Sequence, residues 1–221
     1  MIATALNAVV MVLPWPLKRW VLCKLYRYDI HPRARVGYSW LFPKHLKLDD
    51  GAYVGHLNFS KGLDLISLGA HARIENLNWI TAHPAGGIHF EHVPNRVPSL
   101  VLEEHAAITC QHFFDCASQV RIGKFTTVAG LRSQFFTHSI NMEACRQDTQ
   151  PIDIGAYCLV GTGAIVLAGS VLPDYSVASA GCLLNKPLKE TYCLYAGRPA
   201  VPLKQLPTTS GYFLRSTGFV T

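Results

Sequence analysis

Charged residues are scarce in this 221-residue sequence, at 15% of the chain, compared with about 25% in a typical soluble domain. Hydrophobic residues make up 49%, so the scarcity of charge does not indicate disorder, and the chain can bury a core of its own. A globular protein with so few charged residues has too few of them to cover its whole surface with groups that water solvates well. We therefore expect part of that surface to be covered by further copies of the same chain.

The few charges are unevenly distributed. The chain has 20 Lys and Arg residues against 14 Asp and Glu residues, a formal net charge of +6. Residues 1–48 hold eight of these bases and one acid, Asp29, whereas residues 49–221 hold the other twelve bases and thirteen acids. The sequence contains no helix-turn-helix, zinc-finger or RNA-binding signature. We therefore expect no nucleic-acid partner, and the chain beyond its basic N-terminal segment is close to neutral.

Paired cysteine motifs are also absent. The seven cysteines include no Cys-x-x-Cys and lie far apart, so neither a disulfide framework nor a zinc knuckle is indicated. This pattern is typical of small buried thiols in a reducing compartment, and we expect a cytoplasmic protein.

No hydrophobic run is long enough to span a bilayer. The N-terminal run, residues 2–13, has about half of the ~20 residues that a spanning helix needs, and Pro14 and Pro16 follow it. A signal peptide carries its positive charge before the apolar run, whereas here the basic residues come after it. We interpret residues 1–29 as an amphipathic helical lead-in. It can pack on the domain or lie against the inner face of a membrane, and the sequence leaves both alternatives open.

A six-residue period organises most of the chain. From Ile154 the sequence reads IGAYCL, VGTGAI, VLAGSV, LPDYSV, with an aliphatic residue first and a small residue fifth in every unit. Shorter runs begin at Ile30, Leu48, Leu68, Leu102 and Ile122. Four consecutive units that match at both positions would arise by chance less than about one time in a hundred. The period predicts a triangular coil in which three hexads make one turn and the aliphatic residues form a continuous internal column.

Two segments interrupt the period. Residues 81–101 contain three prolines, two glycines and three histidines, and residues 134–151 break the pattern again. Long excursions from a rigid scaffold are where functional sites usually lie. The predicted organisation is therefore a lead-in over residues 1–29, a coiled domain over residues 30–190 with these two excursions, and a C-terminal strap and tail over residues 191–221.

The hexads and the sequence AGRPA at residues 196–200 resemble the hexapeptide-repeat acyltransferases. The resemblance covers about residues 30–206. It implies an all-β fold, a left-handed parallel β-helix of hexapeptide coils with a short N-terminal helical segment and a C-terminal strap. It also implies transfer of an acetyl group from acetyl-CoA to a hydroxyl group, and a homotrimer with CoA bound between neighbouring subunits.

The segment IGKFTTVAGLRSQFFTHSIN, residues 122–141, looks most like bacterial enzymes that decorate capsular, exopolysaccharide or lipopolysaccharide glycans. This resemblance implies that the acceptor is a sugar hydroxyl in glycan or polysaccharide biosynthesis. A small molecule, such as a free sugar, an amino sugar or an antibiotic, is the alternative acceptor.

His138, in the second excursion, is the predicted general base. In sugar-directed members of the resembled family a histidine in a similar loop takes the proton from the acceptor hydroxyl, a role that suits imidazole because its pKa lies near neutrality. A base needs a group that orients it, and the transition state needs hydrogen-bond donors. We expect Asp115, His112 and Asn141 to serve these needs, although a role in a turn is nearly as well founded for Asp115.

The resemblance to the last coil of the family also implies the CoA contacts. They are Thr162, Ala180, Gly181, Asn185, Lys186 and Arg198. The backbone amides of Ala180 and Gly181 would bond the pantetheine amides, and Lys186 would meet a phosphate as a point charge. The family often has an arginine directly after the Pro-Ala of the AGRPA-like motif, where this sequence has Val201. Arg198 or Lys204 is expected to replace it.

Asn78, Trp79 and Arg146 are the predicted acceptor contacts. Aromatic faces stack well on sugars, so Asn78 and Trp79 could form a platform for the acceptor, and Arg146 lies in the same excursion as His138. The alternative for the first two residues is purely structural, as an asparagine at a corner and a packed tryptophan.

Two other classes of protein compete with the acyltransferase interpretation. His83, His89 and His92, with His105 near them in the sequence, raise a metal site, but they lie in a proline-rich excursion and not at repeated places on a coil wall. We therefore expect no metal. A non-catalytic scaffold built from the same coils is the second competitor, and it would need neither a histidine in an extruded loop nor the AGRPA terminus.

Overall fold

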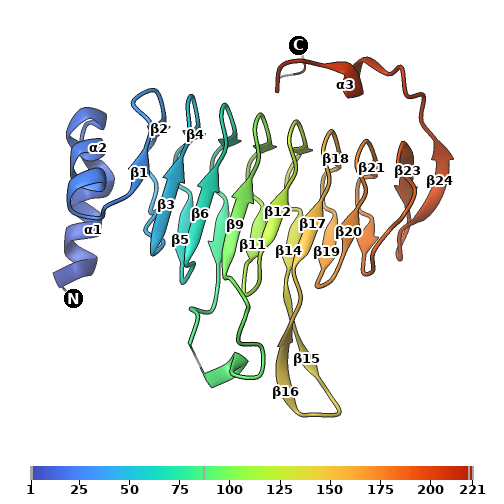
Figure 1. The fold of residues 1–221 in the computed structure, drawn as a ribbon, viewed down its shortest axis with the longest axis horizontal. Helices are drawn as coiled ribbons and strands as arrows, with labels where there is room; N and C mark the ends of the chain where they lie inside the picture. Colours follow the sequence, from blue (N-terminus) through green and yellow to red (C-terminus); the bar gives the residue numbers. More distant parts are fainter. Residues whose placement is uncertain (1, 87, 219, 221) are drawn as a thin grey trace.

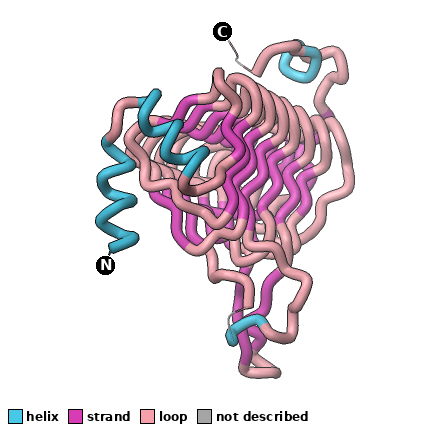
Figure 2. Tube along the Cα trace, turned by 60° about the vertical axis from the view of Figure 1, so that its left-hand side comes forward, coloured by secondary structure: helices cyan, strands magenta, loops and turns pink. Residues whose placement is uncertain are grey.

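The computed structural model describes residues 2–86, 88–218 and 220. They form a three-sided parallel β-helix, a prism of stacked coils with two helices at its N-terminal end (Figures 1 and 2). Successive strands along the chain go to three different sheets, here called faces A, B and C. The hydrophobic core is the interior of this prism.

The three faces consist of short strands. Face A contains β1 (Asp29–Ile30), β3 (His45–Leu48), β6 (Leu65–Leu68), β9 (Ser99–Leu102), β12 (Val120–Ile122), β17 (Ile152–Ile154) and β20 (Val171–Leu172). Face B contains β2 (Arg35–Val36), β4 (Tyr53–Val54), β7 (Arg73–Ile74), β10 (Ala107–Ile108), β13 (Thr127–Val128), β18 (Leu159–Val160), β21 (Val177–Ala178), β23 (Cys193–Ala196) and β24 (Val201–Gln205). Face C contains β5 (Phe59–Lys61), β8 (Trp79–Thr81), β11 (Phe113–Asp115), β14 (Gln134–Phe136), β19 (Ile165–Leu167) and β22 (Leu183–Leu184).

The hexad pattern corresponds to the inside of the prism. The first residues of the four C-terminal hexads point into the prism and are fully buried, namely Ile154, Val160, Val166 and Leu172. The small fifth residues are buried as well, namely Cys158, Ala164, Ser170 and Ser176. Each buried aliphatic side chain contributes roughly 1.5–3 kcal/mol, but only when the next coil covers it. The predicted internal column is therefore confirmed.

Coil length explains an irregularity in the repeat. In face A, Ile154 pairs with Leu172, eighteen residues later, whereas Leu48 pairs with Leu68, twenty residues later. The longer coils carry two inward side chains on their face A strand, as Val120 and Ile122 do on β12. The second inward residue makes the coil two residues longer. This extra length accounts for the two-residue slip between the sequence runs that begin at Leu102 and Ile122.

Both excursions are shorter than the sequence intervals predicted for them. The first occupies residues 82–98 and includes the 3-10 turn η1 (Ile88–Phe90), because Ser99–Leu102 already forms β9. The prediction that the second begins at residue 134 is wrong, since Gln134–Phe136 forms β14 and Phe135 is fully buried in the core. Beyond it, β15 (His138–Asn141) and β16 (Arg146–Thr149) form an antiparallel hairpin. Both excursions project from the same side of the prism (Figure 1).

A ladder of polar side chains lies inside the corner between faces B and C. Its members are Ser39, Asn58, Asn78, His112 and Ser133. The Asn78 amide donates to Asn58 Oδ1 at 3.0 Å and to the Thr109 carbonyl at 2.8 Å, and its oxygen accepts the His112 N–H at 2.9 Å. Asn78 is only 1% exposed. It therefore cannot contact an acceptor as predicted, because its hydrogen bonds are committed to neighbouring coils.

The N-terminal helices pack on the first coil. Helix α1 (Ile2–Val12) and helix α2 (Trp15–Lys24) place Val10, Val21 and Leu22 in the hydrophobic core. Lys18 is buried between them and the coil, where its Nζ donates to the Met11 carbonyl at 2.8 Å and to the Gly37 carbonyl at 2.6 Å. Burial lowers the pKa of Lys18 to about 8. Among the described residues, no helix combines the length and the apolarity needed to cross a bilayer.

The C-terminal segment folds back along the prism (Figure 1). Strand β24 is antiparallel to β23, and helix α3 (Gly211–Leu214) then returns toward earlier coils. The Tyr212 hydroxyl donates to the Cys158 carbonyl at 2.8 Å, and the Arg215 guanidinium lies 3.8 Å from the centre of the Tyr212 ring. This segment therefore belongs to the fold, although the sequence pattern had assigned it no role.

The polar ladder predicts that a substitution inside the prism, which leaves the surface unchanged, strongly lowers the stability of the fold. Asn78→Ala should lower the free energy of unfolding by roughly 2–4 kcal/mol, because it leaves the Thr109 carbonyl and the His112 N–H without their partner. Chemical denaturation followed by circular dichroism measures this. Asn185→Ala, at an exposed residue, is the matched control and should change little. Equal stabilities for the two variants would contradict the ladder.

Candidate active site

The structure brings together His138 and Asp115, the predicted base and the residue predicted to orient it. Asp115 is the last residue of β11 and lies beside Phe136 of β14 in parallel register. The chain leaves the coil at Thr137, so His138 is the second residue beyond the strand. His138 Nδ1 lies 2.5 Å from Asp115 Oδ2. The pair is therefore anchored on one side in the rigid coil.

Several contacts hold the Asp115 carboxylate in place. Asp115 Oδ1 accepts the Ala117 N–H at 3.0 Å and lies 3.4 Å from the Thr137 hydroxyl, which also donates to the main-chain carbonyl of Asp115 at 2.9 Å. The side chain of Asp115 is 9% exposed and that of His138 is 28% exposed. The carboxylate raises the pKa of the His138 imidazole above its ordinary value, while partial burial acts in the opposite direction. Because Nδ1 faces Asp115, Nε2 is the nitrogen left to face a substrate.

His83, from the first excursion, is a second imidazole at this site. Its ring is perpendicular to that of His138 at 5.8 Å between centroids, and it lies 5.7 Å from the His89 ring. Burial lowers the pKa of His83, and the neighbouring His138 adds to this effect. Two adjacent groups with pKa values shifted in opposite directions are typical of acid–base sites. From the sequence alone His83 is a candidate only for metal binding, because the repeat pattern does not show that the two excursions meet.

Arg96 fastens the first excursion to the coil. Its guanidinium is buried, and it donates to the carbonyls of His83 at 2.7 Å, Ala117 at 2.8 Å and Pro84 at 2.5 Å. It also stacks over the Phe90 ring at 4.4 Å. Since Ala117 follows Asp115 closely on the coil, these bonds hold His83 near the carboxylate. The sequence carried no sign of this role, because an arginine in a proline-rich loop resembles any exposed base.

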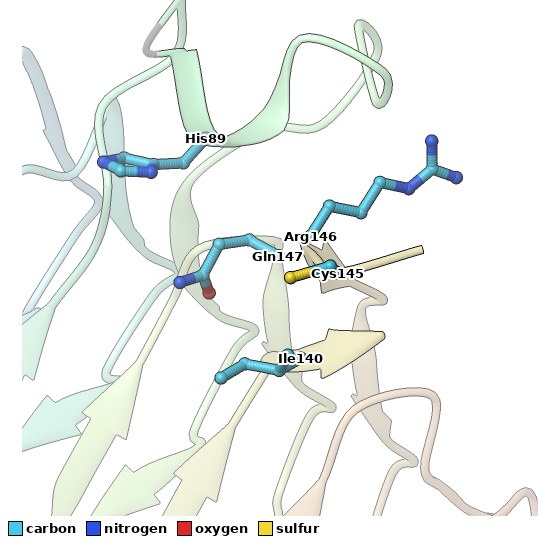
Figure 3. Close-up of a pocket in the computed structure, with 5 residues that line it drawn as sticks. All are labelled: His89, Ile140, Cys145, Arg146 and Gln147. Atoms are coloured by element: carbon cyan, nitrogen blue, oxygen red, sulfur yellow. The ribbon is translucent and has the colours of Figure 1, made fainter. Parts of the chain in front are cut away.

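Two hollows flank the histidines. One, of about 360 Å³, is lined by Lys61, Gly62, Thr81, Ala82, His83, Pro84 and Asp115. The other, of about 410 Å³, lies between η1 and the hairpin and is lined by His89, Ile140, Cys145, Arg146 and Gln147 (Figure 3). Figure 3 shows the Gln147 side chain between His89 and Ile140, while the Arg146 guanidinium is directed away from them. Arg146 thus borders a hollow, as an acceptor contact should, but it does not point into it.

His112 and Asn141 do not join the pair. His112 is buried in the polar ladder, where Nδ1 accepts the Ser133 N–H at 3.1 Å and Nε2 lies 2.9 Å from the Thr109 hydroxyl. Burial lowers the pKa of His112 to about 4, so it is a neutral structural residue. Asn141 lies at the far end of β15 from His138, and its side-chain oxygen accepts the Ala144 N–H at 3.0 Å. In this structure both residues therefore make structural contacts, and neither has the catalytic contact that the sequence predicted.

The residues predicted to contact CoA flank face C at the C-terminal end of the prism. Gly181 donates its N–H to the Thr162 carbonyl at 2.8 Å, and Arg198 Nε donates to the Gly181 carbonyl at 2.6 Å, so these residues form a row along one corner. Because its N–H is already used, Gly181 cannot bond pantetheine as predicted, whereas Ala180 is an exposed residue. Asn185 and Lys186 follow β22 at the other edge of face C and are exposed.

Trp79 has the exposure that an acceptor platform requires. It lies on the outer surface of face C, is 51% exposed and packs against Phe59, with 4.6 Å between the ring centroids. In the register of face C it lies two strands from Gln134 and next to Phe113 of β11. Trp79 and Asp115 therefore belong to neighbouring strands of the same face.

Comparison with known proteins rests on structure. No protein-family model and no curated protein sequence matches the chain. A mutant of AntD, an N-acyltransferase from Bacillus cereus in complex with dTDP and coenzyme A, matches with a TM-score of 0.54 over 72% of this chain and 85% of that one, at 11% identity. A second AntD mutant, in complex with dTDP-4-amino-4,6-dideoxyglucose and coenzyme A, gives 0.53 over 73% and 81%, at 11% identity. The polysialic acid O-acetyltransferase OatWY gives 0.53 over 80% and 84%, at 16% identity.

The fold is the left-handed β-helix of the hexapeptide-repeat acyltransferases. The all-β class and the left-handed parallel β-helix expected from the hexads are thus confirmed. Within the part of the chain that the structure describes, no three histidine, cysteine, aspartate or glutamate side chains are arranged to hold a metal ion. Of the histidines in the first excursion, His83 lies against His138, and His89 lies against His83.

The pKa values of His138 and His83 are shifted in opposite directions, and this difference can be tested by NMR titration. In Asp115→Asn the pKa of His138 should fall, because the carboxylate that favours the imidazolium is gone. In the unaltered protein, His83 should titrate below the ordinary range of histidine. Both are measured from the pH dependence of the imidazole C–H resonances, with exposed His45 as an internal control. An unchanged His138 titration in Asp115→Asn would contradict the pairing.

Proposed function

We propose that this protein is an acetyl-CoA-dependent O-acetyltransferase that acts on a sugar hydroxyl in glycan biosynthesis. The observation that carries the proposal is the His138–Asp115 pair, 2.5 Å apart, at the edge of face C between the two excursions. The shared fold supports it, since OatWY is a polysialic acid O-acetyltransferase and the AntD structures contain coenzyme A. The fold alone would be weaker support than the fold together with the His138–Asp115 pair, because one fold can carry many unrelated functions.

The proposed reaction assigns one proton path to His138. Its Nε2 takes the proton of the acceptor hydroxyl as the oxygen attacks the thioester carbonyl of acetyl-CoA. The carbon–sulfur bond then breaks, the acetyl group stays on the acceptor oxygen, and His138 returns the proton to the CoA thiolate. Asp115 orients the ring through Nδ1 and stabilises the imidazolium that forms between the two steps, a role that matches the raised pKa of His138.

His83 complements this base. With a lowered pKa it is neutral at pH 7, and a neutral imidazole can donate one hydrogen bond from its N–H. Since it lines the same hollow as Asp115, we assign it to the acceptor or to the oxyanion that develops on the thioester carbonyl. Arg96 then acts as a positioning residue through the His83 carbonyl.

CoA is proposed to lie along the C-terminal end of face C. Thr162, Ala180 and Arg198 offer exposed groups at one edge, and Asn185 and Lys186 do so at the other. Lys186 and Arg198 supply the positive charge that the phosphates require. An amino sugar or another small molecule is the alternative acceptor, favoured by the sugar nucleotide in the second AntD structure.

A homotrimer is proposed on the basis of face C. Its outer surface carries aromatic pairs in tilted contact, Phe59 with Trp79 at 4.6 Å and Phe113 with Phe136 at 5.4 Å between ring centroids. Exposed aromatic side chains grouped in this way are typical of an interface between copies. Because Asp115 belongs to the same face, a neighbouring copy would close one side of the active site and of the CoA cleft.

The reaction is tested first by removing the base. His138→Ala should lower acetyl transfer by roughly 10²- to 10⁴-fold, measured as thiol release from acetyl-CoA with a panel of glycans, free sugars and amino sugars. The variant should still be stabilised by CoA, since a ligand at 100 times its Kd adds about 2.7 kcal/mol. His45→Ala, at an exposed residue of face A, is the matched control. Near-normal turnover of His138→Ala would remove it from the mechanism, and no thermal shift with CoA would contradict the acyltransferase itself.

The trimer is tested on its apolar face. Trp79→Glu should reduce the mass measured by light scattering from that of a trimer to that of a monomer, because it places a charge where desolvation is costly. Leu203→Glu, at an exposed residue of β24, is the matched control and should leave the mass unchanged. An unchanged mass for Trp79→Glu would show that face C is not the contact between copies.

A further inference from the structure

Helix α1 is exposed along most of its length and carries no charge. Its sequence, IATALNAVVMV, contains no acidic or basic residue. Val10 is buried against the coil, but Val9 and Val12 are 57% and 58% exposed, and Leu6 is exposed as well. A surface helix that only contacts water normally turns charged residues outward. The exposed side of α1 therefore lacks what a water-facing side would need.

The polar contacts of α1 are directed toward the protein. The Asn7 side-chain oxygen accepts a hydrogen bond from the Tyr26 hydroxyl at 2.5 Å, and the Met11 carbonyl accepts one from buried Lys18 at 2.8 Å. These bonds, with Val10 in the core, define which side of the helix faces inward. The arrangement leaves an apolar side outward.

Helix α2 and the residue after it extend this exposed apolar surface. Leu17, Trp20 and Leu25 are exposed, with Trp20 at 56%. Both helices lie beyond the first coil at the N-terminal end of the prism (Figures 1 and 2). An exposed tryptophan beside aliphatic side chains is typical of the boundary between water and lipid. We call Leu6, Val9, Val12, Leu17, Trp20 and Leu25 the N-terminal apolar surface.

The charges around this surface are positive and largely unpaired. Of the eight bases in residues 1–48, Lys18 is buried, while Arg33 and Lys47 contact Asp50 and Asp49. Among the described residues, five have no ion pair with an acid, namely Arg19, Lys24, Arg27, Arg35 and Lys44. Asp29 is the single acid in this part of the sequence. The chemical complement of the surface is therefore apolar and anionic at once.

Two points identify the occupant. A second copy docking through the same end would bring five unpaired cations against five others, which is unfavourable. A bilayer with anionic lipids offers acyl chains to the apolar residues and head groups to the bases. With eleven residues, α1 is about 17 Å long, too short to cross a hydrocarbon core of about 30 Å. It can therefore lie in the surface of the bilayer but not cross it.

We propose that the N-terminal apolar surface docks this protein on an anionic membrane surface, with α1 lying in the plane of the lipid head groups. The cytoplasmic leaflet of a cell membrane, which contains anionic lipids, is such a surface. Docking does not depend on the acyl-transfer reaction, so the two proposals can fail separately.

Vesicle sedimentation of the full-length protein tests the docking. Phosphatidylcholine vesicles with 30% phosphatidylglycerol should pellet the protein at low salt, pellet less of it as salt increases, and do so better than phosphatidylcholine alone. The double variant Val9→Asp/Val12→Asp should lose most of this binding, and Lys24→Glu/Arg27→Glu should lose both binding and salt dependence. These side chains are exposed, so the fold should be retained, and circular dichroism verifies this. Leu203→Asp, exposed at the other end of the prism, is the control and should bind normally.

Three outcomes would overturn the proposal. They are equal sedimentation with and without anionic lipid, binding by Val9→Asp/Val12→Asp at the level of the unaltered protein, and a fall in solution mass of this variant without any loss of lipid binding. The last would show that a second copy covers the surface. Acetyl transfer to a soluble acceptor, measured in parallel, should be unchanged in these variants.

Discussion

The architecture depends on one constraint, which is that each coil can bury its inward side chains only against the coils above and below it. A single turn of this chain presents a few aliphatic residues and cannot close a core alone. Leu48 must therefore lie beside Leu68, and Ile154 beside Leu172, or the internal column opens to water. The same constraint keeps chemistry out of the interior. Reactive groups are left with the corners, the outer faces and the segments that leave the coil.

The candidate active site follows from this division. Asp115 is part of strand β11 and is therefore held rigidly by the coil. His138 lies just beyond β14 in the second excursion, and His83 lies in the first excursion. Arg96 connects the two parts, because a buried guanidinium must find carbonyl partners and finds them on both the excursion and the coil. Two segments without the hexad period are thereby held at fixed distances, as acid–base chemistry requires.

The parts of the structure that could be predicted from the sequence are those governed by the period. The column of aliphatic residues, the small buried fifth residues and the fold class all follow from six-residue spacing. His138 and Asp115 could be named because the loop resembles a family loop. The meeting of His83 with His138 could not, since it depends on how two aperiodic segments fold toward each other. Asn78 and His112 were misassigned because a polar residue at a corner can point inward into a hydrogen-bonded ladder or outward to a substrate, and its spacing is the same in both cases.

Low overall charge leaves two apolar surfaces on the outside, and their different electrostatic surroundings separate their partners. Face C carries the aromatic pairs Phe59–Trp79 and Phe113–Phe136. The charges on these strands are of both signs, with Lys61 on β5 and Asp115 on β11, so a second copy would not meet charge of a single sign. The N-terminal part of the chain, which carries the N-terminal apolar surface, has five bases with no acidic partner among the described residues. We therefore expect the same end of another copy to be repelled and an anionic surface to be attracted. In both proposed associations hydrophobic burial would supply the driving force, but it does not discriminate between partners. The uneven distribution of a few charges makes that choice.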